Sequence, residues 1–332
     1  MPNAADTLLL PILNGDVNAN SGPWLFLGAR APDKGFPDGL TDNLICEQHM
    51  RGPFLELQMR GANVQTAISS EHPFEGGFVL IGKHRGENEA MIARANSLCR
   101  QGATILIAGD KTSGIGSLKK RISQKLQIEG SLAKHHATVF WVRNELESTA
   151  LQTPATFSPL EGFKTAPGMF SPEKIDKGSA FLAEFIDKSV RGAVADFGAG
   201  WGYLSQTIIQ NSAASSLDVF EAHWPSLEAA KMNLQPLQKL PIVYHWLDIT
   251  REPITRRYDC VVMNPPFHAG RKTEPVLGEN FIEVAAKVLK PKGRLLLVAN
   301  SGLPYERKLS AIFSNSRELG KRDGFKILLA EK

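Results

Sequence analysis

The stretch Tyr258–Gly270, YDCVVMNPPFHAG, joins a short apolar run to an abrupt polar and proline-rich end. The run Cys260–Met263 has no polar alternation, which predicts a strand of a parallel sheet that is buried on both faces. Pro265 and Pro266 lack the backbone N–H that a strand ladder needs, so the strand must end at Asn264. Because ligands bind at the carboxyl ends of strands in an open α/β sheet, this strand end is a candidate site.

The composition is that of a soluble globular protein, with 42% apolar and 22% charged residues, and 332 residues suffice for two domains. No apolar run approaches the roughly 18 residues of a membrane span, and Leu8–Leu13 lacks the flanks of a signal peptide. Cys46, Cys99 and Cys260 show neither disulfide nor metal spacing, so we expect a cytoplasmic protein without a bound metal. A net charge of +4 permits a nucleic-acid partner without demanding one.

Predicted strands and helices alternate along the chain, which indicates an α/β fold with a largely parallel sheet. A polar, proline-containing segment around residues 145–158 is the expected linker, and it divides the chain into domains 1–150 and 151–332. Alternation at Leu55–Met59 predicts a further strand. Ser171, Pro172 and Glu173 have the pattern of a helix start, and the helix should run to Ile186.

The two halves of the chain share an order of elements. FVLIG (residues 78–82), a helix and QGATILIAG (101–109) correspond to CVVMN (260–264), a helix and KGRLLLVAN (292–300). On this match Gly102 aligns with Gly293, and Gly82 aligns with Asn264. We interpret the match as a duplicated domain, although any chain of α/β repeats would share part of it.

A glycine-rich turn, DFGAGWG (196–202), follows the predicted strand Ala193–Phe197. Its glycines, which permit positive φ and the close approach of a ligand, are Gly198, Gly200 and Gly202. Glu221 ends the next strand, at the spacing of an acid that binds ribose hydroxyls. A dinucleotide or S-adenosylmethionine (SAM) would fit, and the G-x-G-x-G spacing and Asp196, which suits a cationic tail, favour SAM. Asp248 ends the third strand as either an acceptor for the adenine amino group or a turn residue.

The NPPF end suits methyl transfer to an aromatic amino nitrogen, whose lone pair is delocalised into its ring. The Asn264 amide oxygen and the Pro265 carbonyl can accept the two N–H groups, which favours tetrahedral geometry and stabilises the positive charge that forms. Pro266 fixes the loop, and Phe267 can stack on the base. We therefore assign the chemistry to Asn264, Pro265, Pro266 and Phe267, which act by alignment of the reactants.

DFGAGWG, Glu221, Asp248 and NPPF, in this order, resemble class I SAM-dependent methyltransferases that modify exocyclic amino groups. KTAPGMFSPEKIDKGSAFL (164–182), NPPFHAG and VANSGLPYERKL (298–309) are similar to the RsmC/RlmG-like ribosomal RNA guanine-N2 methyltransferases, and AGDKTSGIGSLKK (108–120) resembles their first domain. The resemblance implies two tandem Rossmann-like domains, the first degenerate and the second with a mostly parallel seven-stranded sheet. It also implies a guanine of ribosomal RNA, most simply of 16S RNA, as the substrate.

The motifs and the resemblance together imply SAM contacts from Phe170, Asp176, Gly178, Ser179, Asp196, Gly198, Gly200, Glu221, Asp248 and Asn264. The SAM contacts of the first four and of Asn264 come from the resemblance alone, and the residues themselves are equally consistent with packing roles for Phe170, Gly178 and Ser179. The first half has no D-x-G-x-G motif, so we expect it to bind no SAM and to support folding or hold RNA. The candidate phosphate contacts are Lys83, His84, Arg85, Lys119, Lys120, Arg121, Arg271 and Lys272.

Other functions stay open on the residues alone. Adenine-N6, 23S guanine-N2 and protein-glutamine methyltransferases share N-P-P-[FY], although Phe267 and the long first domain disfavour the glutamine case. The G-x-G-x-G spacing and NPPF disfavour a nucleotide-dependent oxidoreductase, and the intact motifs disfavour a non-catalytic RNA-binding assembly protein. We expect a monomeric enzyme that acts on ribosomal RNA or on the small ribosomal subunit.

Overall fold

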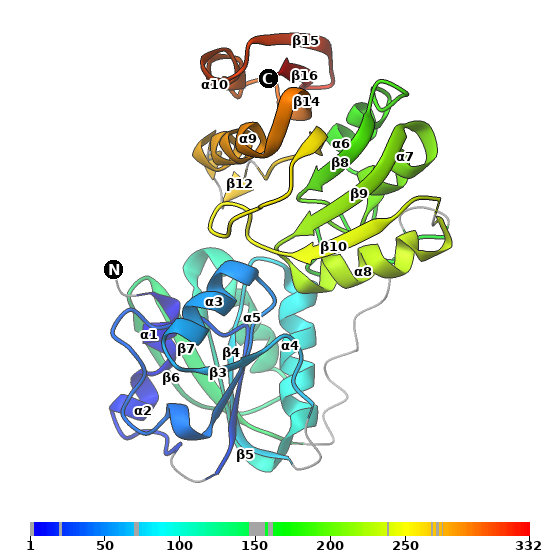
Figure 1. Ribbon diagram of the computed structural model, residues 1–332. Helices are drawn as coiled ribbons and strands as arrows, with labels where there is room; N and C mark the ends of the chain where they lie inside the picture. The colour runs from blue at the N-terminus through cyan, green and yellow to red at the C-terminus, as the bar shows by residue number, and fades with distance from the viewer. Residues whose placement is uncertain are drawn as a thin grey trace. The chain divides into compact units, whose positions relative to one another are not determined.

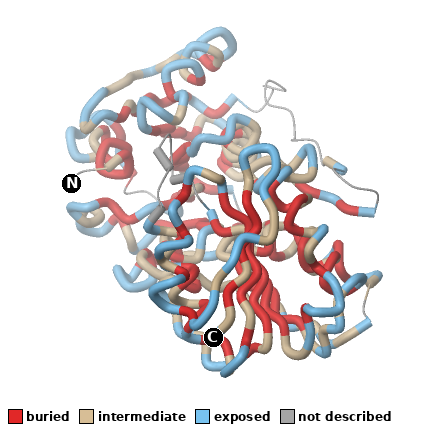
Figure 2. Tube along the Cα trace, turned by 90° about the horizontal axis from the view of Figure 1, so that it is seen from above, coloured by how far each residue is buried: buried red, intermediate tan, exposed pale blue. Residues whose placement is uncertain are grey.

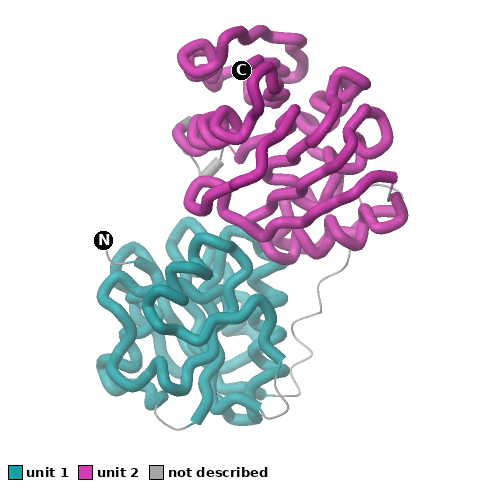
Figure 3. Tube along the Cα trace, viewed as in Figure 1, with its two compact units in different colours: residues 1–155 teal, residues 156–332 magenta. Residues whose placement is uncertain are grey.

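The computed structural model describes residues 3–19, 22–69, 73–145, 157–158, 162–237, 239–266, 268–269, 272–273 and 275–332. The chain forms two compact units, Met1–Ala155 and Thr156–Lys332 (Figure 3). The predicted domain boundary at residues 150/151, and most of the predicted linker, lie outside the described residues. None of the helices in the described part of the chain is long and apolar enough to cross a membrane.

Each unit is built on a seven-stranded sheet, and the two sheets have the same strand order. Figure 1 shows the helices and strands of the two units along the chain. The first sheet runs β3 (Asn63–Gln65), β2 (Leu44–Glu47), β1 (Trp24–Leu27), β4 (Phe74–Leu80), β5 (Cys99–Asp110), β7 (Ala137–Arg143) and β6 (Ile128–Lys134). The second runs β10 (Ile242–Trp246), β9 (Ala213–Glu221), β8 (Arg191–Phe197), β11 (Tyr258–Met263), β14 (Leu289–Asn300), β16 (Phe325–Glu331) and β15 (Asn315–Arg322). The five strands from β3 to β5 in the first sheet, and from β10 to β14 in the second, are parallel to their neighbours. The remaining pairs, β5 with β7 and β7 with β6, and β14 with β16 and β16 with β15, are antiparallel.

Helices cover both faces of each sheet. Unit 1 contains α1 (Ala4–Leu8), α2 (Leu10–Leu13), α3 (Arg51–Met59), α4 (Arg85–Leu98) and α5 (Ile115–Ile122), with the short 3-10 helices η1 (Thr41–Asn43) and η2 (Lys111–Ser113). Unit 2 contains α6 (Lys177–Ala183), α7 (Tyr203–Asn211), α8 (Trp224–Leu234), α9 (Pro275–Val288) and α10 (Tyr305–Ile312), with η3 (Gln235–Leu237) and a small hairpin of β12 (His268–Ala269) and β13 (Lys272–Thr273). In unit 2, α6, α7 and α8 pack on one face of the sheet, and α9 and α10 pack on the other.

The central strands are buried on both faces, as their continuous apolar runs predict. In β1, Trp24 and Phe26 join one core cluster, while Leu25 and Leu27 join the cluster on the opposite face. The buried residues follow the strands through the middle of each unit, and the exposed ones collect in helices and loops (Figure 2). Polar groups that must meet a ligand are therefore confined to the ends of these strands.

Two local predictions are wrong. Leu55–Met59 belongs to helix α3, where Leu57 is fully buried and Met59 is 79% exposed, so its short apolar alternation did not indicate a sheet face. The helix expected from Ser171 begins instead at Lys177, with Asp176 as its N-cap. Ser171 has a left-handed φ of 46°, which non-glycine residues rarely adopt, and its hydroxyl donates to the Lys174 carbonyl instead of accepting a helix N–H.

The sheets also share a register, which corrects the alignment of the two halves. Val79 of β4 pairs with the ninth residue of β5, and Met263 of β11 pairs with the ninth residue of β14, each strand having twelve residues. Leu80, not Gly82, therefore stands at the position of Asn264. Gly102 corresponds to Lys292 and not to Gly293, since both are fourth in their strands and have φ of 74° and 63°.

A buried carboxylate stabilises unit 1 at the end of β2. Glu47 is 1% exposed and accepts hydrogen bonds from the guanidinium of Arg94, with Nη2–Oε2 at 2.7 Å, and from the Ile68 N–H at 2.6 Å. Burial by itself raises the pKa of Glu47, but the hydrogen bonds from His49 and Arg94 lower it to about 2. The ionised carboxylate is therefore part of the folded core of this unit.

We predict that Glu47→Gln lowers the free energy of unfolding of unit 1 by about 2 kcal/mol at pH 7, because a charged acceptor is lost. Since the folded pKa lies below the unfolded value of about 4.3, this stabilisation is present above that pH and disappears as the pH falls toward 2. Urea titrations at pH 7 and pH 3 measure the difference. Glu56→Gln, which breaks the exposed ion pair with Arg60, is the matched control and should change stability by less than about 0.5 kcal/mol. Equal effects of the two substitutions would contradict the prediction.

Candidate active site

The carboxyl ends of four neighbouring parallel strands in unit 2 carry polar side chains. Asp196 is the penultimate residue of β8, Glu221 ends β9, Asp248 follows β10 and Asn264 follows β11. These strands are adjacent in the sheet and all parallel, so their ends lie on one edge. The structure thus gathers the principal predicted site residues, which are up to 68 positions apart (196 to 264), on a single edge of the sheet.

The turn between β8 and α7 is open enough for a ligand. Gly200 has φ of 57°, and a Cβ built at this position would meet no atom within 4 Å. Its N–H donates to Oε2 of Glu221 at 2.8 Å, which ties the turn to the end of β9. Gly202, with φ of 99°, caps the start of α7. Glycine is required here by the backbone, and the vacant space beside Gly200 lets a ligand approach it closely.

Glu221 is held rigidly at the end of β9. One carboxylate oxygen accepts the Gly200 N–H, and the other accepts the N–H of His223, both at 2.8 Å. Burial raises the pKa of Glu221 from its ordinary value. Each oxygen keeps a further lone pair for an additional donor. A vicinal diol, such as that of a ribose, offers two donors, one for each of these oxygens.

Asp196 is the least satisfied acid of the site. Its side chain is fully buried, Oδ2 accepts from the Ser205 hydroxyl at 2.6 Å, and Oδ1 has no hydrogen-bond partner among the described residues. Burial raises the pKa of Asp196, the hydrogen bonds from Ser205 lower it and the nearby Glu221 raises it, which together bring the pKa to about 7. A cationic partner would stabilise the ionised form. This arrangement fits the ammonium of an amino-acid tail and does not fit an anionic phosphate.

Asp248 is used by its own turn. Its Oδ1 accepts from both the N–H and the hydroxyl of Thr250, at 3.1 and 2.7 Å, and Arg251 lies 3.5 Å from Oδ2. Of the two roles that the sequence left open for Asp248, the structure therefore shows the one of a turn residue. The adenine contact stays a prediction, since Oδ1 retains only part of its acceptor capacity for a ligand.

Asn264 is joined to the start of α6. Its Nδ2 donates to Oδ2 of Asp176 at 3.0 Å and to the hydroxyl of Ser179 at 2.7 Å, while its buried Oδ1 has no partner in the described part of the chain. Gly178 lies between these two residues, and a Cβ there would stand 3.0 Å from the Phe325 ring. Gly178 is thus explained by packing within the unit.

The remaining predicted residues differ in what the structure describes. Phe170 is 55% exposed, and its carbonyl accepts from the Trp201 indole N–H at 3.0 Å. Pro265 is buried and Pro266 exposed. Phe267 lies outside the described residues, so its predicted stacking on a base stays a prediction.

The positioning contacts missed from the sequence include those of Ser205 with Asp196 and Trp201 with Phe170, besides the contacts of Asn264 with the start of α6. The serine lies in the first turn of the helix after the glycine turn, where a search for donors to a buried acid would have found it. The indole of Trp201 is 31 residues from Phe170, and no local pattern indicates that contact.

The candidate phosphate contacts of unit 1 are partly neutralised. Arg85 and Arg121 both pair with Glu89, at 2.9 and 3.2 Å. Lys83 and His84 are exposed beside them at the end of β4. Lys119 and Lys120 lie on α5. Arg271 and the side chain of Lys272 lie outside the described residues, so the structure does not test those two predictions.

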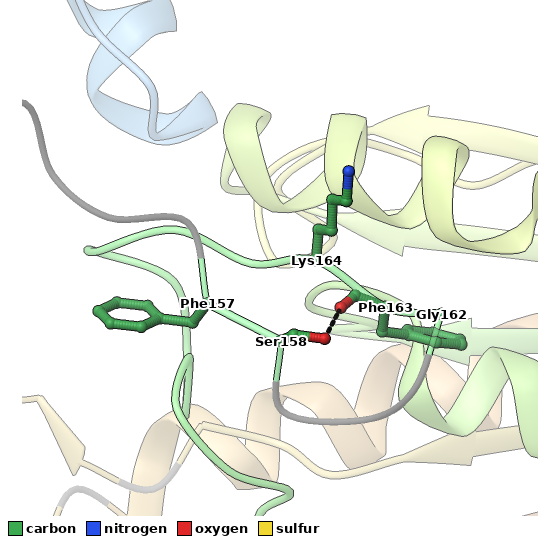
Figure 4. A pocket seen from close by; sticks show the side chains of 5 residues that line it. All are labelled: Phe157, Ser158, Gly162, Phe163 and Lys164. Atoms are coloured by element: carbon green, nitrogen blue, oxygen red, sulfur yellow. Dashed lines mark hydrogen bonds between the residues drawn. The ribbon is translucent and has the colours of Figure 1, made fainter.

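One further pocket lies in unit 2, beside the glycine turn, because the Phe163 ring packs on Trp201 with their ring centroids 5.6 Å apart. It is lined by Phe157, Ser158, Gly162, Phe163 and Lys164, and the Ser158 hydroxyl donates to the Phe163 carbonyl at 2.9 Å (Figure 4). None of the lining residues is ionisable except Lys164, and none belongs to the predicted site. We assign no chemistry to it.

Unit 1 has the same framework with different groups at the corresponding positions. Gln48 stands at the position of Glu221. Its Oε1 accepts the N–H of Met50, the N-cap of α3, and Glu221 accepts the N–H of the N-cap of α8 in the same way. The Gln48 amide donates to the Ala29 carbonyl, so its N–H is satisfied within the unit. Leu80, 6% exposed, replaces Asn264. At the two aligned positions, unit 1 therefore has neither the carboxylate of Glu221 nor the side chain of Asn264.

Comparisons with known proteins agree with this geometry. A family model described as the methyltransferase small domain matches residues 161–329. A protein of Sodalis glossinidius named Ribosomal RNA small subunit methyltransferase C is 30% identical over 291 residues, covering 80% of this chain and 78% of that protein. A protein of Haemophilus influenzae with the same name is 26% identical over 312 residues, covering 88% and 92%.

A solved structure has the same fold along almost the whole chain. The 16S rRNA N2 methyltransferase RsmC of T. thermophilus, in complex with AdoMet and guanosine, superimposes with a TM-score of 0.80 at 23% identity, covering 99% of this chain and 91% of that one. Sheet order, glycine turn and family match together define a methyltransferase of the class I fold. Within that class, the chain belongs to the Ribosomal RNA small subunit methyltransferase C family.

The buried Asp196 generates a prediction about stability. Its folded pKa of about 7 lies above the unfolded value of about 3.9, so the folded protein loses stability as the pH rises between these values. We predict that Asp196→Asn raises the free energy of unfolding of the ligand-free protein at pH 8 by up to about 4 kcal/mol, and that the gain vanishes near pH 4.

Chemical denaturation at both pH values measures this difference. Asp323→Asn, at an exposed turn position, is the matched control and should leave stability nearly unchanged at either pH. A loss of stability in Asp196→Asn at pH 8 would show that the carboxylate is better satisfied than its contacts indicate.

Proposed function

We propose that this protein transfers a methyl group from SAM to the exocyclic N2 amino group of a guanine in 16S ribosomal RNA. The observation that carries the proposal is the Asn264 amide, whose two N–H groups are bound within the protein while its buried Oδ1 has no partner in the described part of the chain. Such an oxygen is an acceptor for an amino group. The proposal also includes a cytoplasmic location and a monomeric chain.

The carboxyl edge of unit 2 supports SAM as the methyl donor. Asp196 would accept the cationic amino group of its tail, and Glu221 would accept the ribose hydroxyls. The open space beside Gly200 lets the cofactor lie close to the backbone. When bound, SAM supplies an electrophilic methyl group on a positively charged sulfur. No metal is needed for such a donor.

The residues after β11 would then act on the amino nitrogen. Oδ1 of Asn264 and the Pro265 carbonyl accept its two N–H groups, which turns the lone pair toward the methyl carbon and stabilises the charge that develops. The nitrogen lone pair forms the new N–C bond while the C–S bond breaks and its electron pair stays on sulfur. The surplus proton on the methylated nitrogen passes to water.

The substrate proposal draws on the relatives. Members of the family are named for methylation of small-subunit ribosomal RNA, and the T. thermophilus structure carries guanosine with AdoMet. A guanine in 23S RNA and an adenine N6 are alternative acceptors that the same amide could serve.

Mass mapping of ribosomal RNA from a deletion strain tests the substrate. We expect one guanine of 16S RNA to lack its N2 methyl group and to regain it when purified enzyme and SAM are added to naked RNA or to 30S particles. A missing methyl group on 23S RNA or on adenine would redirect the substrate assignment. A full set of methyl groups in the deletion strain would overturn the proposed activity.

We predict that Asn264→Ala lowers turnover about 10²–10³-fold, because a preorganised acceptor for the transition state is lost. Single-turnover assays on the mapped substrate measure the rate, and calorimetry should find SAM affinity little changed. Asn315→Ala, at an exposed asparagine of β15, is the matched control. Full turnover in Asn264→Ala would remove this residue from the mechanism.

We further propose that only unit 2 binds SAM, since Gln48 and Leu80 replace the acid and the amide in unit 1. The full-length protein should therefore bind one equivalent of SAM in a calorimetric titration. Glu221→Ala should weaken all of that binding by at least about tenfold, the effect of losing one charged hydrogen-bonding group. A second equivalent, or a residual high-affinity site in the variant, would show that unit 1 is not degenerate.

A further inference from the structure

Asp176 and Ser179 form a bidentate acceptor for the Asn264 side chain. The Asp176 carboxylate caps α6 by accepting the Ser179 N–H at 2.8 Å, and the same oxygen, Oδ2, accepts from Asn264 Nδ2 at 3.0 Å. The Ser179 hydroxyl accepts from the same nitrogen at 2.7 Å. Both hydrogens of the amide are therefore engaged by acceptors 85 and 88 residues away in the sequence.

This contact decides which way the amide points. A carboxylate only accepts hydrogen bonds, so the atom beside Asp176 must be the nitrogen, and the oxygen must be on the other side. Oδ1 is buried and has no partner among the described residues. A flipped amide would place oxygen against carboxylate oxygen, which is repulsive. The one free acceptor of Asn264 is thus oriented before any substrate arrives.

The negative charge also changes the strength of that acceptor. A carboxylate that accepts from the amide nitrogen favours the polarised form of the amide, in which the oxygen carries more negative charge. An oxygen polarised in this way stabilises a cationic nitrogen better than an isolated amide does. The effect is largest when the substrate nitrogen carries the most positive charge, during methyl transfer.

Unit 1 offers an internal comparison. Its α1 packs on the corresponding face of the first sheet and has Asn3 as its N-cap and Asp6 at the position of Ser179. The Asp6 carboxylate there accepts the backbone N–H groups of Asp33 and Lys34. Where Leu80 takes the place of Asn264, the Asp6 carboxylate accepts from a loop and from the Asn3 N–H, and the Asn3 amide oxygen accepts from N–H groups of the helix itself.

We propose that Asp176 and Ser179 are positioning residues for the reaction, which act through the Asn264 amide by orienting and polarising its oxygen. This inference rests on the proposed function of the same site. It differs from the role that the sequence resemblance implies for both residues, which is direct contact with SAM. The two roles predict different outcomes in a double-mutant cycle.

The test uses the full-length protein with Asp176→Asn and Ser179→Ala, each made alone and in the Asn264→Ala background. Asp187→Asn and Ser189→Ala are matched controls, because Asp187 accepts the Ser189 N–H in a similar local turn that does not contact Asn264. We expect each test substitution to lower kcat about tenfold, the effect of one weakened hydrogen bond to the reacting group, with KM nearly unchanged. In the Asn264→Ala background the same substitutions should change kcat less than about twofold.

The kinetic measurements are accompanied by an NMR spectrum and by a SAM titration. In protein labelled with [15N]asparagine, the side-chain NH₂ signal that Asn264→Ala removes should move in Asp176→Asn and in Ser179→Ala and stay in place in both controls. SAM affinity by calorimetry should change less than about threefold in all single variants.

A loss of SAM affinity that persists in the Asn264→Ala background would assign both residues to the cofactor and overturn the inference. An unmoved NH₂ signal would overturn it as well, because the amide would then not be held by these groups. The NMR result does not depend on turnover. If the wild-type protein methylates no RNA, the proposed function is wrong, and the NMR spectra still show whether Asp176 and Ser179 hold the Asn264 amide.

Discussion

A parallel strand that is buried on both faces can carry a functional polar group only where it ends, and this constraint shapes the whole site. Just before their ends, β8, β9 and β11 carry buried apolar side chains because helices cover both faces of the sheet, and the one buried acid inside β9, Asp218, is bound by His245, Arg256 and Tyr258 of the same unit. Asp196, Glu221 and Asn264 can therefore stand only at the carboxyl edge, where they meet groups from other strands. The same geometry brings the start of α6 against Asn264, which supplies the acceptors that the strand itself cannot provide.

This constraint also explains how much could be predicted from the sequence. The strand ends are marked by abrupt changes from apolar to polar or glycine residues, so the α/β fold and the positions of Asp196, Gly200 and Glu221 follow from local patterns. The partnership of Asp176 with Asn264 does not, because no periodicity connects residues 88 positions apart. The start of α6 was misplaced for a related reason, since Ser171 has the residue type of a helix cap but a left-handed backbone.

The two units show that a fold and its chemistry can separate. Strand order and register are the same in both, because they depend on apolar residues that neither unit can change without losing its core. The groups at the strand ends are under no such restriction. Gln48 satisfies its amide against the Ala29 carbonyl, and Leu80 is buried by its neighbours, so neither of these two positions leaves an unsatisfied acceptor. The buried acceptor without a partner among the described residues of unit 1, Oδ1 of Asn144, lies elsewhere.

Those unsatisfied acceptors have a thermodynamic consequence. Oδ1 of Asp196 and Oδ1 of Asn264 are both buried without a partner in the described part of the chain, and each such atom lowers the stability of the ligand-free protein. The raised pKa of Asp196 reflects the same cost, since the folded protein resists forming a buried charge. A cationic ligand beside Asp196 and an amino group beside Asn264 would each relieve one of these costs. Binding would therefore recover the free energy that these unsatisfied atoms cost the ligand-free protein, and both ligands should stabilise unit 2 by more than their apolar contacts alone would account for.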